Sequence, residues 1–218
     1  AGIEAASGLL ESEARELNIG FVSRMTRGRP WLRLKVAASL DGKTALSNGV
    51  SQWITGPEAR QDGHRWRARA CAILTGIGTV RDDDPQLNVR AVDTSRQPLR
   101  VVVDSKLETP LTARILQGGP VLVAAAVDDE KRANLLRAAG AEVVVLPNAA
   151  GKVELKDLLE ELGRRGINEV HAEAGFKLNG SLLREGLVDE LLLYLAPCLI
   201  GHEATGMFNL PELTTLDD

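Results

Sequence analysis

The segment VELKDLLEELGRRGINEVHAEAGFKLNGSLLREGLVDELLLYLAP, residues 153–197, contains the pattern that determines the fold class. Two helical patterns, over residues 153–166 and 175–186, each end in a glycine. Each is followed by an apolar strand pattern, over residues 168–174 and 189–197. Strands that alternate with helices of about 10–15 residues are typical of a mainly parallel sheet with helices on both faces.

The same alternation extends toward the start of the chain. Predicted strands, marked by apolar alternation or short apolar runs, cover residues 31–39, 71–75, 99–105, 120–126 and 141–147. Predicted helices cover residues 7–27, 57–70 and 129–140. No repeat, low-complexity tract or linker interrupts the sequence. We therefore expect one α/β domain over residues 30–218, preceded by a helical lead-in over residues 1–29.

Composition and charge restrict the class of protein. The 218 residues carry a net charge of −4, which gives no reason to expect nucleic acid or a membrane surface as a partner. The longest apolar run, residues 191–200, is about half of the roughly 20 residues that cross a bilayer. It is typical of a central buried strand, and it also suits a homodimer contact. Cys71 and Cys198 lie in apolar runs, which predicts small buried thiols and a cytoplasmic protein.

Glycine and polar residues cluster after three predicted strands. Ligands of open α/β sheets bind at the carboxyl ends of strands, so these segments are candidate binding sites. The first, residues 38–56, is long and polar and follows strand 31–39. The second, residues 76–81, is also compatible with a plain turn. It is not a dinucleotide fingerprint, because Arg81 occupies the position of the third glycine.

The third segment, residues 173–181, passes from a strand into a helix through glycine. Gly175 and Gly180 have the spacing of a phosphate loop, but Ser181 stands where that motif requires lysine. The N-terminus of a helix can still bind an anion through its backbone N–H groups. The alternative is a glycine that serves only the packing of the helix on the strand.

Arginines give a second signal. Between residues 60 and 90 the chain has no lysine and six arginines: Arg60, Arg65, Arg67, Arg69, Arg81 and Arg90. On the predicted helix 57–70, Arg60, His64 and Arg67 share one face, and the opposite stripe consists of Ala59, Gly63, Trp66 and Ala70. The guanidinium group presents a fork of donors that suits phosphate, so the group indicates a phosphate site. For each arginine taken alone, a solvated surface is the better interpretation.

Two acidic motifs suggest metal sites without completing one. Asp82, Asp83 and Asp84 are adjacent and cannot all point one way, which favours a capping or turn role with one carboxylate turned toward ligand hydroxyls. His171 and Glu173 share a strand face and match half of a zinc-deaminase signature, but the sequence lacks the Pro-Cys-x-x-Cys half. We expect no metal in this chain, and Glu173 is a candidate substrate ligand.

Four longer motifs then occur in a fixed order. They are KVAASLDGKTALSNGVSQWITGPEAR (35–60), AILTGIGTVRDDDPQLNVR (72–90), VVDS (102–105) and EAGFKLNGSLLREGLVDELLLYLAPCLIG (173–201). Together they closely resemble the reductase domain of the bifunctional riboflavin-biosynthesis deaminase/reductase family. The resemblance implies a dihydrofolate-reductase-like fold. It also implies that residues 1–29 end an upstream deaminase domain, which would hold zinc, and that a last strand lies beyond Asp218.

The resemblance further implies a reaction, in which NADPH reduces the ribosyl side chain of 5-amino-6-(5-phosphoribosylamino)uracil to the ribityl form. The phosphorylated aminopyrimidine would be held by Ser51, Arg67, Leu87, Arg90 and Glu173, with the arginines at its phosphate. NADPH would be held by Ala37, Trp53, Thr79, Asp83, Ser105, Gly175, Phe176, Lys177, Leu178, Asn179, Gly180 and Ser181. Segment 38–56 would wrap the place where the two ligands meet.

The proton chemistry has three candidate side chains. Lys35 shares a strand face with Ala37, so we expect it to point into the same cleft, where a partly desolvated amine can donate a proton. Asp41 and Glu173 are the other candidates, and water is a further source. Two other functions stay open: a pteridine reductase of the same fold, and a non-catalytic nucleotide-binding fragment.

Overall fold

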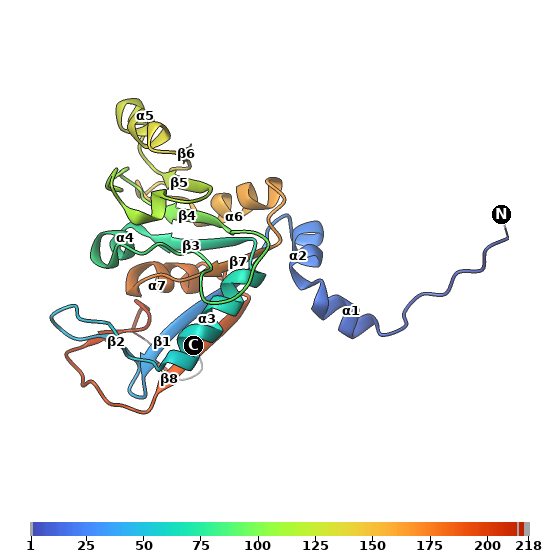
Figure 1. Cartoon of the computed structure of the whole chain (residues 1–218), viewed down its shortest axis with the longest axis horizontal. Coiled ribbons are helices and arrows are strands. Elements are labelled where there is room, and N and C mark those ends of the chain that lie inside the picture. The colour runs from blue at the N-terminus through green and yellow to red at the C-terminus, as the bar shows by residue number, and fades with distance from the viewer. Residues whose placement is uncertain (1, 213, 216–218) are drawn as a thin grey trace.

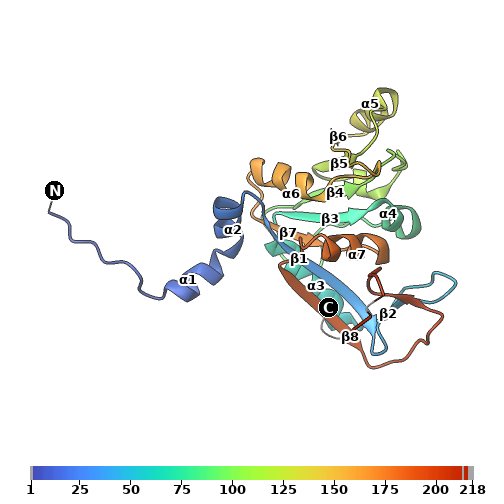
Figure 2. The same ribbon diagram turned by 180° about the vertical axis from the view of Figure 1, so that it is seen from behind.

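A computed structural model describes residues 2–212 and 214–215. Its centre is a seven-stranded sheet in the order β6-β5-β4-β3-β7-β1-β8, and all neighbouring strands are parallel (Figures 1 and 2). The strands are β1 (Trp31–Ser39), β3 (Ala72–Gly76), β4 (Leu99–Val103), β5 (Val121–Ala125), β6 (Ala141–Val145), β7 (Glu169–Ala172) and β8 (Glu190–Ala196). A small antiparallel pair joins β2 (Lys43–Ala45) to β9 (Thr205–Gly206). The predicted mainly parallel α/β architecture is confirmed.

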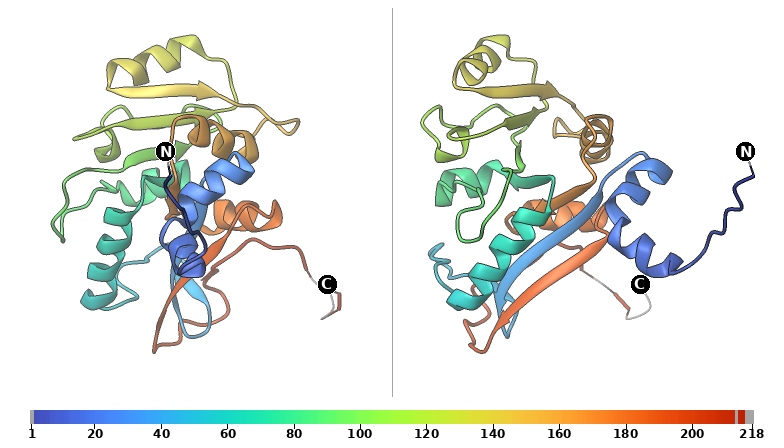
Figure 3. Two further views of the ribbon diagram at one scale, coloured as in Figure 1. Left: turned by 90° about the vertical axis from the view of Figure 1, so that its right-hand side faces the viewer. Right: turned by 45° about the vertical axis from the view of Figure 1, so that its right-hand side comes forward.

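Helices cover both faces of the sheet (Figure 3). One face packs on α6 (Leu155–Arg164) and α7 (Phe176–Arg184), and we call it the α6/α7 face. The other packs on α4 (Ile77–Asp83) and α5 (Glu130–Ala138), and it lies beneath α3 (Pro57–Arg69). We call this second face the α3 face.

Strand β1 shows why the two faces differ. Leu32, Leu34, Val36 and Ala38 are buried in the hydrocarbon core of the α6/α7 face, as their alternation predicts. On the opposite face Arg33 is also buried, because α3 covers it. Strand β1 therefore has one apolar face and one polar face, and helices cover both. Charged groups consequently lie inside the molecule on the α3 face.

The lead-in differs from the single helix predicted over residues 7–27. It forms two helices, α1 (Glu11–Leu17) and α2 (Ile19–Arg27), which meet at Asn18. Asn18 leaves the helical conformation with φ −108° and ψ 21°, and its side chain donates to the Ala14 carbonyl. No residue of α1 is buried. The helical period alone did not reveal this break.

Three other expectations are wrong. The segment after β3 is not a plain turn, because α4 begins at Ile77. Among the described residues the run 191–200 is not a central strand, because β8 lies at the edge of the seven-stranded sheet and Leu191, Leu193 and Leu195 are 45%, 37% and 51% exposed. Cys198 follows that edge strand and is exposed rather than buried. In the described part of the chain, none of the helices has the length and apolar content needed to span a membrane.

Candidate functional site

Strand order brings the polar segments together. β7 pairs with β1 on one side and with β3 on the other, so Ala172 faces Leu34 and Leu74. The segments that follow these three strands are 38–56, 76–81 and 173–181, and each therefore leaves the sheet at the same edge. The carboxyl ends of neighbouring parallel strands are where ligands of this class of sheet bind.

The two glycine-rich turns face one another across this edge. Gly175 is the N-cap of α7, and a Cβ added there would lie 3.7 Å from Thr79 Oγ1, an ordinary contact distance. A Cβ on Gly76 would lie 3.2 Å from the Leu178 side chain. No side chain caps the N-terminus of α7, so its first N–H groups are available to an anion. Packing gives no reason for glycine at position 175.

The later part of the expected cofactor loop has a packing role instead. A Cβ on Gly180 would overlap the carbonyl of Asn209. Asn179 is buried and donates to the Met207 carbonyl at 3.2 Å, and the Asn209 amide donates to the Phe176 carbonyl at 3.1 Å. Helix α7 is thus strapped down by residues 207–209. The cofactor contacts expected of Asn179 and Gly180 stay predictions, and the exposed turn at Gly175 and Lys177 is the accessible part.

On the α3 face, Arg67 and Glu173 form a bidentate ion pair. Arg67 Nε donates to Oε1 of Glu173, and Nη2 donates to Oε2 at 2.8 Å. The two side chains are only 15% and 14% exposed. Burial alone would raise the pKa of Glu173, but the Arg67 guanidinium outweighs it and holds that pKa well below its usual range. Helix α3 and strand β7 thus supply one pair of opposite charges.

Two histidines flank this pair, and the sequence reading gave neither a role. His171 is fully buried two residues before Glu173, with its Nε2 3.5 Å from Glu173 Oε1. His64 lies one turn before Arg67 on α3 and is buried. Burial is the main cause that lowers the pKa of each imidazole to about 4, so both are neutral near pH 7. The sequence did contain a signal for them, because His64 precedes Arg67 by three residues and His171 precedes Glu173 by two.

Lys35 belongs to the same polar layer. Its ammonium lies 5.6 Å from the ring centroid of Tyr194, which pairs with Ala37 across β1 and β8. It is close enough to Glu173 to lower the pKa of that carboxyl. The hydroxyl of Tyr194 donates to Asp62 at 2.6 Å, and burial followed by this contact raises the pKa of the phenol. Ala37 and Lys35 therefore share a face, as predicted.

Arg90 lies on the exposed side of the ion pair. Its Nη1 donates to Asn88 Oδ1 at 2.9 Å, while the carbonyl of the same asparagine accepts from Arg67 at 3.3 Å. Burial, and then Arg67 and Arg114, lower the pKa of Arg90, which shows that three cations gather here. The backbone of Arg114 donates to Asp84 Oδ1 at 2.8 Å. Sequence analysis missed Arg114, because it is far from the others along the chain.

Leu87, Asp83 and Ser105 lie around the same edge. The Leu87 side chain is buried in the core of the α3 face, so only its backbone can face a ligand. Asp83 ends α4 with an exposed side chain, and its pKa is raised by partial burial and by Asp82. Ser105 follows β4 and accepts from the Val153 amide at 3.2 Å.

Segment 38–56 contributes side chains of two kinds. Asp41 accepts from the Ser39 hydroxyl at 2.5 Å and from the Gly201 amide at 2.8 Å, which lowers its pKa to about 2. An ionised carboxylate with these bonds staples two loops and is unsuited to donating a proton. Trp53 is 69% exposed and stacks on Arg60, 4.6 Å from guanidinium to ring centroid, while Ser51 is half-buried.

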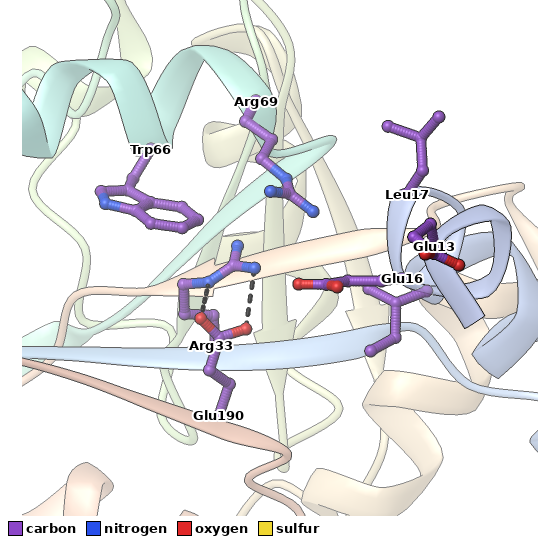
Figure 4. A pocket seen from close by; sticks show the side chains of 8 residues that line it. Glu13, Glu16, Leu17, Arg33, Trp66, Arg69 and Glu190 are labelled. Atoms are coloured by element: carbon purple, nitrogen blue, oxygen red, sulfur yellow. Dashed lines mark hydrogen bonds and ion pairs between the residues drawn. The ribbon is translucent and has the colours of Figure 1, made fainter. Parts of the chain in front are cut away.

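A groove of about 430 Å³ lies at the opposite, amino end of the strands (Figure 4). Arg33 stacks on Trp66 at 4.2 Å and forms two hydrogen bonds of 2.8 Å to Glu190. Arg33 is therefore already paired, and none of the residues that the family resemblance assigns to the substrate or to NADPH lines the groove. Among the residues that the structure describes, no group of His, Cys, Asp and Glu side chains could hold a metal ion.

Comparison with known proteins agrees with this geometry. Residues 30–217 match the family model described as RibD C-terminal domain. The riboflavin biosynthesis protein RibD of Escherichia coli is 41% identical over 232 residues, covering 100% of this chain and 62% of that protein. The chain therefore spans about three fifths of the length of this relative.

Solved structures give the same result. The chain resembles Acinetobacter baumannii RibD with a TM-score of 0.86 and 41% identity, covering 99% of this chain and 59% of that one. It also resembles a diaminohydroxyphosphoribosylaminopyrimidine deaminase/5-amino-6-(5-phosphoribosylamino)uracil reductase from Thermotoga maritima, with a TM-score of 0.83, 28% identity and 100% and 58% coverage. On the family match, the sequence identity and the shared fold, the chain belongs to the RibD C-terminal domain family.

Proposed function

We propose that this chain is an NADPH-dependent reductase that converts the ribosyl side chain of 5-amino-6-(5-phosphoribosylamino)uracil to the ribityl form, in riboflavin biosynthesis. Family membership supports the proposal, as does the name of the Thermotoga maritima relative, which specifies this reductase. We also propose residues 30–218 as the reductase domain and residues 1–29 as the end of a preceding deaminase domain. The family match begins at residue 30, which supports that boundary.

One observation carries the proposal: an anion-binding turn and a charged layer meet at a single sheet edge. The turn at Gly175 and Thr79 has the open contact and uncapped helix N-terminus that a pyrophosphate needs. Near it lie Glu173, which directly follows β7, Lys35 of β1 and Arg67 of α3. Hydride transfer requires two ligands held with their reacting carbons about 3–3.5 Å apart, and two adjoining subsites supply that arrangement.

The residues would divide the work as follows. NADPH, when bound, supplies the hydride, and the α7 N-terminus with Thr79 holds its phosphates. Glu173 accepts hydrogen bonds from the polar substrate, while Arg67 keeps that carboxylate ionised and oriented. Because Glu173 already neutralises Arg67, the substrate phosphate depends more on Arg90, whose side chain is exposed beside it.

Lys35 is the proton donor that we favour. Its side chain lies near Glu173 in a partly buried layer, where an amine can deliver a proton to the opening sugar ring. Asp41 is disfavoured, because its pKa of about 2 keeps it ionised and bound to backbone amides. The expected homodimer remains a proposal, supported by the exposed leucines along β8 at the sheet edge, and light scattering measures it.

The decisive assay follows nicotinamide oxidation with the phosphorylated aminopyrimidine substrate and the intact chain. We expect turnover with NADPH and a much lower kcat/KM with NADH, because no acidic residue follows a dinucleotide fingerprint to select the unphosphorylated ribose. Turnover of dihydropterin but not of the aminopyrimidine would instead identify a pteridine reductase. NADPH binding with neither substrate turned over would identify a non-catalytic nucleotide-binding domain.

A further inference from the structure

His171 is a fully buried imidazole that the proposed chemistry has not used. It lies on β7 between the ion pair at Glu173 and the amino end of the sheet. Within the described chain, neither of its ring nitrogens has a hydrogen-bond partner. A buried polar group without a partner destabilises a fold, and an apolar side chain of similar volume avoids that cost. Stability therefore does not explain histidine at this position.

The groups around His171 determine its protonation state and its possible hydrogen-bond partner. The charged groups that act on it are Glu173, which directly follows β7, Arg67 on α3, and Lys35 and Arg33 on β1. The residue paired with it on β3, Ile73, is apolar. Burial is the largest effect on the imidazole and keeps it neutral above a pKa of about 4. A neutral imidazole carries one N–H donor, and the three cations cannot accept it.

The Glu173 carboxylate is an acceptor that lies near this donor. Its Oε1 lies 3.5 Å from His171 Nε2, and the same oxygen accepts a hydrogen bond from Arg67 Nε. A carboxylate has about four lone-pair directions, and Arg67 occupies two of them. Arg33 is already satisfied by Glu190 and Glu169. The Glu173 Oε1 atom is therefore approached by a cationic donor, Arg67, and by a neutral imidazole, His171.

We propose that His171 is a positioning residue, whose Nε2–H holds the Glu173 carboxylate in place when an anionic substrate competes for Arg67. This inference rests on the proposed function. A substrate phosphate bound mainly at Arg90 also attracts the neighbouring Arg67 guanidinium, which fixes Glu173 in the free chain. The neutral imidazole N–H then preserves the orientation of the Glu173 carboxylate without adding a positive charge to the site. A cation at position 171 would attract the phosphate more strongly and slow the release of the product.

Two substitutions and one control separate positioning from packing. His171→Leu removes the donor and keeps an apolar volume, whereas His171→Gln places an amide donor near the position of Nε2. Val170→Ala is the control, because Val170 is fully buried on the same strand but faces the α6/α7 core. We expect His171→Leu to lower kcat/KM for the substrate about tenfold or more, with the KM for NADPH unchanged. His171→Gln restores most of that loss.

The melting curve completes the test. The melting temperature of His171→Leu equals or exceeds that of the unchanged chain. Val170→Ala instead melts earlier and keeps normal kinetics per folded molecule. Unchanged kcat/KM in His171→Leu, or equal losses in the leucine and glutamine variants, would overturn the inference.

A spectroscopic test does not depend on activity. Nitrogen NMR of labelled histidine identifies the tautomer, and the spectrum of His171→Leu assigns the signal among the three histidines. We expect the Nε2–H tautomer, neutral down to about pH 4, with a shift when Glu173→Gln is introduced. The Nδ1–H tautomer would refute the inference. Absence of turnover in the unchanged chain would refute the proposed function alone, because the tautomer result stands by itself.

Discussion

Replacing Arg67 with alanine should make the stability of the domain depend on pH in a new way. The change removes both donors that hold Glu173, and it leaves a carboxylate that is only 14% exposed. Lys35 stays nearby but forms no hydrogen bond to that carboxylate among those observed in the described residues. The variant therefore contains a nearly buried charge without its main partner.

The size of the effect follows from the burial of the pair. Breaking a buried ion pair by removing one partner costs about 3–5 kcal/mol, and the remaining exposure and Lys35 favour the lower end. For a chain of this length each kcal/mol lowers the melting temperature by about 2–4 °C, so Arg67→Ala should melt about 6–12 °C earlier at neutral pH.

The sign of the pH dependence can be worked out from Glu173. In the unchanged chain its pKa is held below the unfolded value of about 4.3, so the pair stabilises the fold above that pH and weakens as pH falls through the folded pKa. Without Arg67, burial raises the folded pKa above the unfolded one. The variant then loses stability as pH rises from about 4 toward neutrality. The difference between the two proteins should widen across that interval.

Urea unfolding at pH 4 and pH 7 measures this difference. The set comprises the unchanged chain, Arg67→Ala, Glu173→Gln and the double variant. The double variant should recover most of the loss at pH 7, because its buried group is neutral. An Arg67→Ala penalty that is the same at both pH values, or a double variant as unstable as Arg67→Ala, would refute the reasoning.

Three further predictions follow from the glycine turns and the loop staple. Gly175→Val should stay folded, because Thr79 lies at an ordinary contact distance from the added Cβ. It should nevertheless lose NADPH affinity in a fluorescence titration. Normal affinity would show that the α7 N-terminus is not part of the cofactor site. Gly180→Ala should do the reverse: the overlap with the Asn209 carbonyl destabilises the fold by about 1–3 kcal/mol in urea unfolding, and an unchanged midpoint would contradict this close approach. Asp41→Asn should speed amide hydrogen exchange in the loop after β8 at neutral pH, because the charged acceptor of the Gly201 amide is lost. In the unchanged chain the same loosening should occur only as pH falls through about 2, the pKa of Asp41. Equal exchange rates at neutral pH would show that the carboxylate does not hold this loop.

Hydrophobic periodicity was sufficient to predict most of the elements, because strands and long helices bury regular rows of side chains. It failed where an element is short or lies at an edge. Helix α4 spans only seven residues and begins next to two glycines, so its sequence reads as a turn. After Glu190, β8 has the sequence LLLYLA without the polar alternation of a half-exposed strand, which resembles a strand buried on both faces. Edge placement depends on strand order, which periodicity does not contain.

The site was predictable in its residue types and not in its pairings. Arg67 and Glu173 were both candidates, but their ion pair joins residues 106 positions apart and depends on how α3 crosses β7. The different roles of Gly175 and Gly180 could not be predicted for the same reason, because they depend on contacts with residues far away along the chain. Both glycines fit a phosphate loop in sequence, and only the strap at Asn209 shows that the second serves packing.

The unlike faces of the sheet have a consequence for motion. The α6/α7 face is held by hydrocarbon, whose attraction is insensitive to salt, whereas α3 is seated on ion pairs and neutral imidazoles. Local opening of α3 thus has a free energy that changes with ionic strength and proton concentration, whereas opening of the opposite layer depends mainly on hydrocarbon contacts. A charged ligand arriving beneath α3 changes the same balance. The layer that binds the ligand is therefore also the layer whose local opening depends on salt and pH.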